Sequence, residues 1–375
     1  MGVIRTGRRR PASGWRLLAA LPLLAPAAPC IAGNPVAAAE IDWSVYGRAD
    51  VSVDYYSGGG YAAGDLASNS SRLGLRVGHT LETGLTVYGR LERTLDYNRG
   101  DGADLAPRDT YLGLTGAWGT LRLGYMDTAV KDIRSRVDLF GSQLGNARNV
   151  LRAGHRPHFD QRFPNAVRYS SPEQPGWGVD LQGSFDWDGE EDDDEAFPAD
   201  DNERTAVSSA LRYSGERVWV AVGYERVAGR AGAVRSADAL RLGLDWQATE
   251  ALRVTALGQA TRDAYAVDDA DYSDAAAYGA GLLYALEDDL DLRLQYYTLD
   301  VDASGHGARL VSVGPIFHAS ERLRLYATAT YLSNDDDSRL VPWEVGRTAG
   351  PSGEDAKIGS GRSAWAVGSG VRMDF

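Results

Sequence analysis

The feature that most constrains this sequence is an alternation of apolar and polar side chains with a period of two, which begins at Ile41 and recurs to the C-terminus. In the first segment the positions on one face are Ile41, Trp43, Val45, Gly47, Ala49, Val51, Val53 and Tyr55. Successive side chains of a β-strand point to opposite faces, so this period indicates a strand with one apolar face. No run of about 18 apolar residues follows Glu40, so we expect no membrane-spanning helix.

Sixteen segments carry this pattern, an even number, as is typical of bacterial outer-membrane barrels. The predicted strands are Ile41–Ser57, Ser70–Glu82, Leu85–Tyr97, Arg108–Gly116, Thr120–Met126, Asn165–Ser170, Trp177–Trp187, Arg204–Tyr213, Arg217–Arg226, Arg235–Gln247, Leu252–Arg262, Ala275–Leu286, Asp289–Asp300, Ala308–His318, Arg322–Leu332 and Arg362–Phe375. The last strand ends the chain on an aromatic residue, and we expect it to pair with the first strand, because an unpaired apolar edge invites aggregation.

The connections between these segments differ in length in a regular way. Tight turns such as Thr83-Gly84 lie between long polar loops, which are Gly58–Asn69, Asn98–Pro107, Asp127–Pro164, Asp188–Glu203 and Ser333–Gly361. Short turns at one rim and long loops at the other are typical of outer-membrane barrels. A soluble β-sandwich also alternates, but it gives no reason for loop lengths to alternate as well. The pattern therefore favours a closed transmembrane barrel.

Residues 1–39 differ from the rest of the chain and are predicted to be a secretory signal. Five arginines and the apolar stretch Leu17–Ile31 precede three alanines, which offer a cleavage site before Glu40. A transmembrane anchor is the alternative, but prolines interrupt the stretch and it is shorter than the roughly 20 residues of a spanning helix. Residues 40–375 would then be the barrel domain.

The charge and the cysteine content narrow the function. The net charge is −13, and without the five arginines of the predicted signal it is about −18. A chain this acidic lacks the clustered Lys and Arg that phosphate contacts need, so nucleic acid is not expected as a partner. The only cysteine, Cys30, falls within the predicted signal, so the domain would have no disulfide. Inter-strand hydrogen bonds of a closed barrel would supply the stability instead.

Several stretches carry a family likeness. They read SVYGRADVSVDYY, SRLGLRVGHTLETGLTVYGRLE, RDTYLGLTGAWGTLRLGYMDT, RFPNAVRYSSP and, at the end, VRMDF. Over Ile41–Phe375 the chain resembles the Gram-negative general porins. The resemblance implies a sixteen-stranded antiparallel transmembrane β-barrel, assembled as a homotrimer, whose third loop folds inward to narrow the pore. That loop is Asp127–Pro164 here, and it lacks the Pro-Glu-Phe-Gly-Gly stretch of the enterobacterial loop.

The same resemblance implies a function and a location. The chain would form a water-filled channel in the cell outer membrane, through which small hydrophilic solutes and ions diffuse passively. Outer-membrane lipid and lipopolysaccharide would be its surroundings. The acidic run Asp188–Glu203 is expected to be a solvated loop, with binding of divalent cations at the lipopolysaccharide surface as the alternative, because hard cations take carboxylate oxygens.

Inward positions of the first six strands supply a candidate pore constriction. Five arginines have this parity near mid-height, namely Arg48, Arg76, Arg90, Arg122 and Arg168. Guanidinium groups suit such a wall because they stay charged at any relevant pH. The third loop offers carboxylates for the opposing side, which are Asp132, Asp138 and Asp160. The field between the two sides would orient dipolar solutes and sort ions. The alternative is that these arginines are scattered charges tied to Glu92, Asp50 or backbone carbonyls.

Other functions find less support in the sequence. No nucleophile elbow, zinc pair or phosphate-binding loop is found, so we expect no catalysis, metal or cofactor. An outer-membrane enzyme such as a phospholipase would need a Ser–His pair on the lipid face, and His79 has no such serine beside it. A solute-specific channel would need a slide of aromatic side chains, and Tyr46, Tyr88, Tyr111 and Tyr297 look too scattered. For a general channel we expect a weak cation preference, since loop carboxylates and the acidic loops oppose only five arginines.

Overall fold

The computed structural model describes residues 41–98, 107–173, 175–185, 204–229, 236–267, 271–348 and 358–375. These residues belong to one compact unit, Glu40–Phe375. The predicted signal at 1–39 and the acidic run Asp188–Glu203 lie outside the described residues, so both stay predictions.

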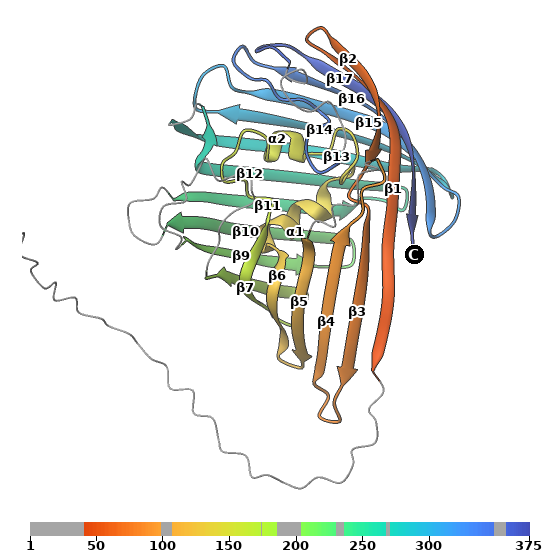
Figure 1. Ribbon diagram of the computed structural model, residues 1–375, viewed down its shortest axis with the longest axis vertical. Helices are drawn as coiled ribbons and strands as arrows, with labels where there is room; N and C mark the ends of the chain where they lie inside the picture. The colour runs from red at the N-terminus through yellow and green to blue at the C-terminus, as the bar shows by residue number, and fades with distance from the viewer. Residues whose placement is uncertain are drawn as a thin grey trace, which may run out of the picture. The chain divides into compact units, whose positions relative to one another are not determined.

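Seventeen antiparallel strands within the described residues form one sheet that closes on itself (Figure 1). Their bounds are β1 (Asp42–Gly58), β2 (Tyr61–Ser68), β3 (Arg72–Thr80), β4 (Thr86–Thr94), β5 (Pro107–Gly116), β6 (Gly119–Asp127), β7 (Arg162–Ser170), β8 (Trp177–Ser184), β9 (Arg204–Ser214), β10 (Val218–Gly229), β11 (Ala237–Gln247), β12 (Leu252–Ala266), β13 (Tyr272–Glu287), β14 (Leu290–Val301), β15 (Ala308–His318), β16 (Leu323–Asn334) and β17 (Ala364–Asp374). Each strand from β3 to β17 pairs with the next along the chain, and β17 pairs with β1 to close the ring. This confirms the predicted pairing of the last strand with the first.

The predicted loop Gly58–Asn69 is wrong, because most of it forms β2. Gly59 and Gly60 make a tight turn with φ angles of 61° and 93°, a backbone conformation that glycine adopts without strain. β2 then pairs with one half of β1, and β3 pairs with the other half. Together β2 and β3 occupy one position in the ring. The barrel is therefore sixteen-stranded, as the alternation predicts.

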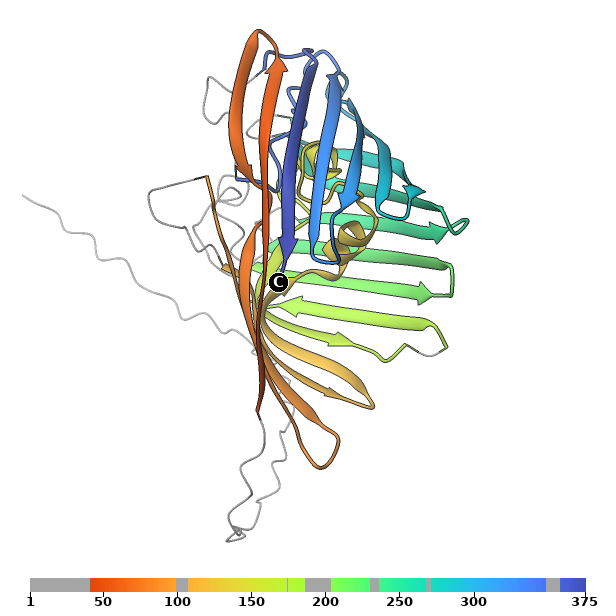
Figure 2. The ribbon, with the colours of Figure 1, turned by 90° about the vertical axis from the view of Figure 1, so that its right-hand side faces the viewer.

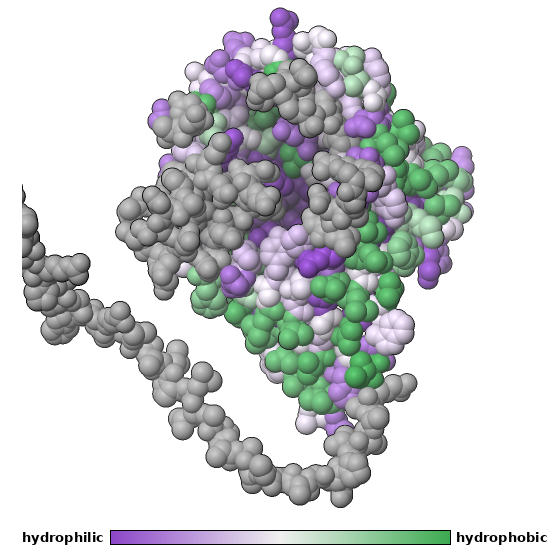
Figure 3. Space-filling model, viewed as in Figure 1, coloured by the Kyte–Doolittle hydropathy of each residue, from purple (hydrophilic) through white to green (hydrophobic). Residues whose placement is uncertain are grey.

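The two faces of the barrel wall differ in polarity, as in proteins that span a membrane with strands. Large apolar side chains point outward and are exposed; Leu112, for example, is 65% exposed. Inward positions carry buried polar side chains such as Ser52 and Gln295. In Figure 3 hydrophobic residues gather on the flank of the molecule, and hydrophilic residues line the hollow at its centre. No helix in the described part of the chain has the length and apolar content of a membrane span.

The third long connection, residues 128–161, folds into the interior of the ring. It contains α1 (Ala129–Val137) and α2 (Arg148–Leu151). Both helices lie within the curve of the sheet in the two ribbon views (Figure 1, Figure 2). The connection is shorter than the predicted loop Asp127–Pro164 because β6 and β7 extend into it. Its inward course confirms the expectation that came with the family resemblance.

The last long loop also turns inward, which the sequence did not predict. Residues 335–348 follow β16, and Trp343 among them is only 1% exposed. Its ring lies 5.1 Å from that of Tyr56 on β1. The same cluster includes Leu144 at the tip of the third loop. Two loops therefore meet inside the barrel.

Candidate functional site

The third loop is held against one side of the barrel by α1. Thr128 caps the helix by accepting a hydrogen bond from the backbone N–H of Lys131 at 3.2 Å. Ile133 packs on β10 and β11 where two glycines leave room for it. A Cβ at Gly243 would lie 2.5 Å from Ile133 Cγ2, and one at Gly223 would lie 2.7 Å from Ile133 Cδ1. The glycines therefore let the helix approach the wall closely.

Buried charges fix the return of the loop. Asp160 is 1% exposed and accepts two hydrogen bonds from Arg134 of α1, at 2.9 and 3.2 Å. Arg241 of β11 lies 3.7 Å from the same carboxylate, and Arg148 of α2 lies 3.9 Å from it. Although burial alone would raise the pKa of Asp160, these cations hold it far below its usual range. Asp160 is therefore a buried anchor of the loop and does not face the pore.

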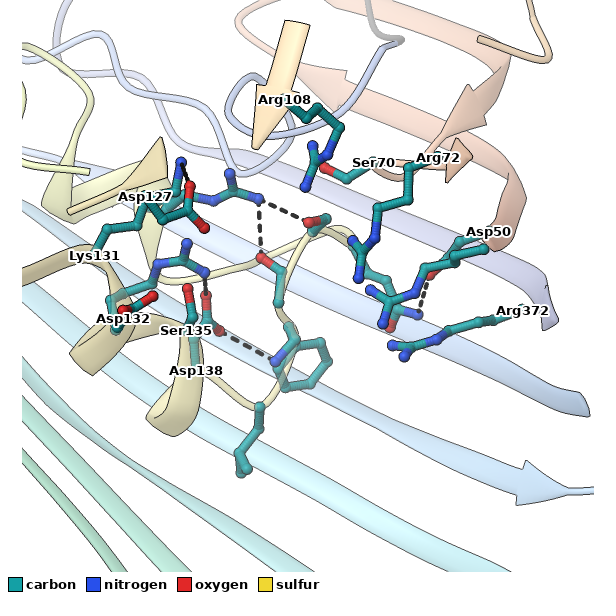
Figure 4. A pocket seen from close by; sticks show the side chains of 18 of the residues that line it. Asp50, Ser70, Arg72, Arg108, Asp127, Lys131, Asp132, Ser135, Asp138 and Arg372 are labelled. Atoms are coloured by element: carbon teal, nitrogen blue, oxygen red, sulfur yellow. Dashed lines mark hydrogen bonds and ion pairs between the residues drawn. The ribbon is translucent and has the colours of Figure 1, made fainter. Parts of the chain in front are cut away.

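A cavity of about 590 Å³ lies between the loop and the wall formed by β1, β3–β7 and β14–β17 (Figure 4). Among the described residues, eleven cationic and six acidic side chains line it. The cations are Arg48, Arg72, Arg90, Arg108, Lys131, Arg134, Arg148, Arg162, Arg293, Arg324 and Arg372, and the acids are Asp50, Glu92, Asp109, Asp127, Asp132 and Asp138. This narrowed, charged part of the lumen is called the constriction below.

One side of the constriction is organised around a buried carboxylate. Glu92 of β4 is 1% exposed and receives hydrogen bonds from Arg90 and Arg108, each at 2.6 Å. Tyr46 donates to it as well, at 2.9 Å, and Arg72 lies 3.6 Å away. Arg90 has a second carboxylate, Asp109, at 3.4 Å, so three arginines share two anions and this side of the lumen keeps an excess positive charge.

Next to it, across β1, a second group of arginines shares one half-buried carboxylate. Asp374 accepts hydrogen bonds from Arg48 at 2.9 Å and from Arg372 at 3.0 Å. Arg324 lies 3.9 Å from the same group. Again the cations outnumber their acidic partner.

The sequence-predicted constriction residues fall in three places. Arg48, Arg90, Asp132 and Asp138 line the constriction. Arg76 and Arg90 line a neighbouring cavity of about 280 Å³. Within the described residues Arg76 stacks on the Tyr46 ring, 4.1 Å from its centre, and no ion pair of Arg76 is seen.

Arg122 and Arg168 lie on the far side of α1. Both line a third cavity, of about 340 Å³. Arg122 donates a hydrogen bond to Tyr88 at 3.1 Å. Arg168 pairs with Asp132 at 2.7 Å and with Asp180 at 3.1 Å. The structure therefore brings together only some of the predicted residues at the constriction.

The aromatic positions are also less scattered than the sequence suggested. Tyr88 and Tyr111 meet edge to face, with ring centres 6.1 Å apart, and both line the cavity beside Arg76. Tyr46 stacks on that same arginine. Tyr297 is fully buried elsewhere, in the cluster that contains Ile133.

Several cations of the constriction were missed in the sequence. Arg293, Arg324 and Arg372 lie on strands after the sixth, whereas the predicted constriction drew on inward positions of the first six strands only. Each has the inward register of its strand, so the same alternation could have found them. Arg148 lies in the third loop, where no periodic signal marks its direction.

A closed barrel with an apolar outer band and a charged lumen defines a class, the channels of the outer membrane. Comparison with protein families matches residues 24–337 to the Gram-negative porins. The chain belongs to that family, as its sequence predicts, and is an outer-membrane porin.

Individual relatives agree with this assignment. The chain is 30% identical over 165 residues to the major outer membrane protein P.IB of Neisseria sicca, which covers 44% of each chain. It is 30% identical over 183 residues to a chitoporin of Vibrio furnissii, covering 46% of this chain and 48% of the relative. The aligned parts thus span less than half the length of these curated relatives.

Solved structures share the fold over nearly the whole chain. The anion-selective porin from Comamonas acidovorans superimposes with a TM-score of 0.75 at 22% identity, covering 90% of this chain and 100% of that one. OmpF of Salmonella typhi superimposes with a TM-score of 0.64 at 14% identity, covering 89% and 97%. At these identities the likeness shows the barrel fold.

Proposed function

We propose that this porin is a water-filled channel for the passive diffusion of small hydrophilic solutes and ions, and that it prefers anions. The observation that carries the preference is the lining of the constriction, where eleven cations meet six carboxylates. Nine cations remain when Arg134 and Arg148, the partners of the buried Asp160, are left out. Charge at the narrowest point acts most strongly on a passing ion, because little water is left there to screen it.

This proposal revises the weak cation preference expected from the sequence. That expectation set five arginines against three loop carboxylates and the acidic loops together. Asp160 does not belong to the charges of the constriction, because it is buried behind the loop. Cations outside the predicted set, such as Arg72, Arg108 and Arg372, do line the constriction. The acidic run 188–203 lies outside the described residues. A structurally similar porin is described as anion-selective, which supports the proposal.

The selectivity predicts a measurable reversal potential. In planar bilayers under a salt gradient, the channel should show anion preference, and replacing Arg90, which lines the constriction, by Ala should weaken it. A unit charge about 4 Å away is worth about 1 kcal/mol even in bulk water, so the anion-to-cation permeability ratio should fall about fivefold. Arg309→Ala is the control, because Arg309 is paired with Asp335 and points away from the lumen. A cation-selective parent channel would contradict the proposal.

We also propose that the chain assembles as a homotrimer through the outward face of its first strands. Leu73, Leu75 and Leu91 are exposed on this face. An apolar face of this kind can pack against another copy as well as against lipid. A structurally similar outer membrane protein, OmpT of Vibrio cholerae, is described in a trimer form, which supports the assignment.

A charged residue on this face should abolish the trimer. Leu75→Arg is expected to convert the trimer band on an unheated gel in mild detergent to monomer. Leu240→Arg on β11 places the same charge at another exposed leucine, 48% exposed against 37% for Leu75, far from β1 in the ring, and it should keep the trimer band. Both variants bear a similar cost of about 2–4 kcal/mol if they face lipid, so only an interface distinguishes them. A monomeric parent protein would refute the assignment.

A further inference from the structure

One arginine of the constriction has hydrogen-bonding capacity that the described residues do not use. Arg293 of β14 is 2% exposed and donates through Nη1 to Gln143 Oε1 at 2.9 Å and to the Leu139 carbonyl at 3.1 Å. Its Nε and Nη2 are buried without an acceptor among the described residues. Its guanidinium carbon lies 4.3 Å from the centre of the Phe140 ring. A buried guanidinium with unused donors is costly unless an anion completes it.

Two further arginines lie on neighbouring strands of the same wall. Arg324 of β16 and Arg372 of β17 are directly opposite each other in the strand register. Like charges in such a cross-strand pair destabilise a sheet. Arg324 Nε also has no acceptor in the described part of the chain. All three side chains line the constriction cavity.

A network of short contacts connects these arginines to one another. Gln143 joins Arg293 to Asp50, since its Nε2 lies 3.5 Å from Asp50 Oδ2. Asp50 stands opposite Arg372 in the β1–β17 ladder and accepts a hydrogen bond from Tyr326 at 2.6 Å. Arg293 and Arg372 therefore flank the same carboxylate, and the tip of the third loop covers the group.

The charges of this group leave a definite excess. Its cations are Arg48, Arg293, Arg324 and Arg372, and its acids are Asp50 and Asp374, so two positive charges remain uncompensated. Guanidinium groups bind oxyanions through paired N–H donors in a fixed fork. A ligand with two negative charges and several acceptor oxygens would satisfy both the charge and the unused donors.

We propose that Arg293, Arg324 and Arg372, with Gln143 of the third loop, form a binding site for small oxyanions that carry two negative charges, the chemistry shared by phosphate, sulfate and small dicarboxylates. The site rests on the proposed anion preference and deepens it, because it adds to the general electrostatic attraction a specific binding site for one class of anion. Its occupant would bridge the barrel wall and the loop.

Inorganic phosphate tests the site in chloride solution. At about pH 8 phosphate is mostly dianionic. It should reduce the chloride current through the refolded channel in a saturable way, and acetate, with one charge, should do so far less. Arg324→Gln should raise the half-blocking phosphate concentration about tenfold, since a hydrogen bond to a charged group is lost. Arg293→Gln should do the same if the barrel folds, which a heat-modifiable gel band checks.

Controls separate this proposal from the anion preference. Arg309→Gln removes an outward arginine and should leave block unchanged. The site is overturned if phosphate does not block a parent channel that prefers anions. It is also overturned if phosphate blocks the Arg324→Gln and Arg372→Gln channels as strongly as the parent channel. In both cases the anion preference stands. A parent channel that prefers cations would overturn the proposed function itself. Equal block by acetate and phosphate would overturn the requirement for two charges.

Discussion

Asp160→Asn is expected to release the third loop from the barrel wall. The substitution keeps the size of the side chain but leaves Arg134, Arg148 and Arg241 around a neutral group. Removing one partner of a buried ion pair costs about 3–5 kcal/mol, because the remaining charge stays buried and uncompensated. We expect a loss of this size in the free energy of loop closure, and a wider, noisier channel.

Limited trypsin digestion measures the release directly. The loop carries several arginines, among them Arg134 and Arg148, which are buried in the parent protein. The parent loop should resist cleavage, and Asp160→Asn should be cut within 128–161 while the barrel strands stay intact. Asp132→Asn is the matched control on the same loop. Asp132 is half exposed and Arg168 keeps Asp180 as a partner, so its loss should cost at most about 1 kcal/mol. A resistant Asp160→Asn loop would show that these charges do not anchor it.

The pH dependence of this anchor follows from the sign of the pKa shift. The pKa of Asp160 is held below its usual range by the surrounding cations. A carboxyl group with a lowered pKa stabilises the folded state fully above the ordinary pKa, about 4, and loses that contribution only as the pH falls through the lowered value. The anchor should therefore be constant between about pH 5 and 8, and trypsin resistance of the parent should not change across that range.

The barrel was predictable because its signal is local. Alternation with a period of two is written in every strand, and the turns between strands are short enough to be read from a few residues. Even the error at Gly58–Asn69 had a local signal, since two adjacent glycines are typical of a hairpin turn and β2 follows them at once. Because these glycines were assigned to a loop, the strand that follows them, β2, was not predicted.

The constriction was less predictable because it depends on where loops fold. Parity shows that Arg372 points inward, but not that the tip of the third loop covers it. Asp160 and Asp132 look alike in the sequence, yet one is buried among cations and the other is half exposed. Loops have no period that marks one side as buried, so their contacts are decided by distant parts of the chain.

Trp343→Ala is expected to uncouple the last long loop from the third loop. Trp343 fills the space between Tyr56 of the wall and Leu144 at the tip of the third loop. Replacing a buried tryptophan by alanine costs about 3–5 kcal/mol, because apolar contacts are lost and a cavity remains. Since the last loop has no helix or strand of its own among the described residues, we expect it to lose its inward position.

The backbone contacts around Trp343 explain why the third loop should respond as well. Gly145 donates its N–H to the Pro342 carbonyl at 2.8 Å, and the side chain of Asn149 accepts from the Val345 N–H at 3.1 Å. These hydrogen bonds form only while the last loop is seated. Without them the tip of the third loop, which includes Gln143, loses its contacts to the last loop and keeps those to the wall, such as the hydrogen bonds from Gln295 and Ser312 to the Gly145 carbonyl. The position of the constriction therefore depends on both loops.

Single-channel recording separates this effect from a general loss of stability. Trp343→Ala should show larger current fluctuations and a raised mean conductance, with a folded barrel on unheated gels. Trp118→Ala is the control, because Trp118 is exposed at a turn and stacks on Tyr169, away from both loops. It should leave both conductance and noise as in the parent channel. Quiet, unchanged currents in Trp343→Ala would mean that the third loop holds its place without the last loop, through α1, Asp160 and its contacts to the wall.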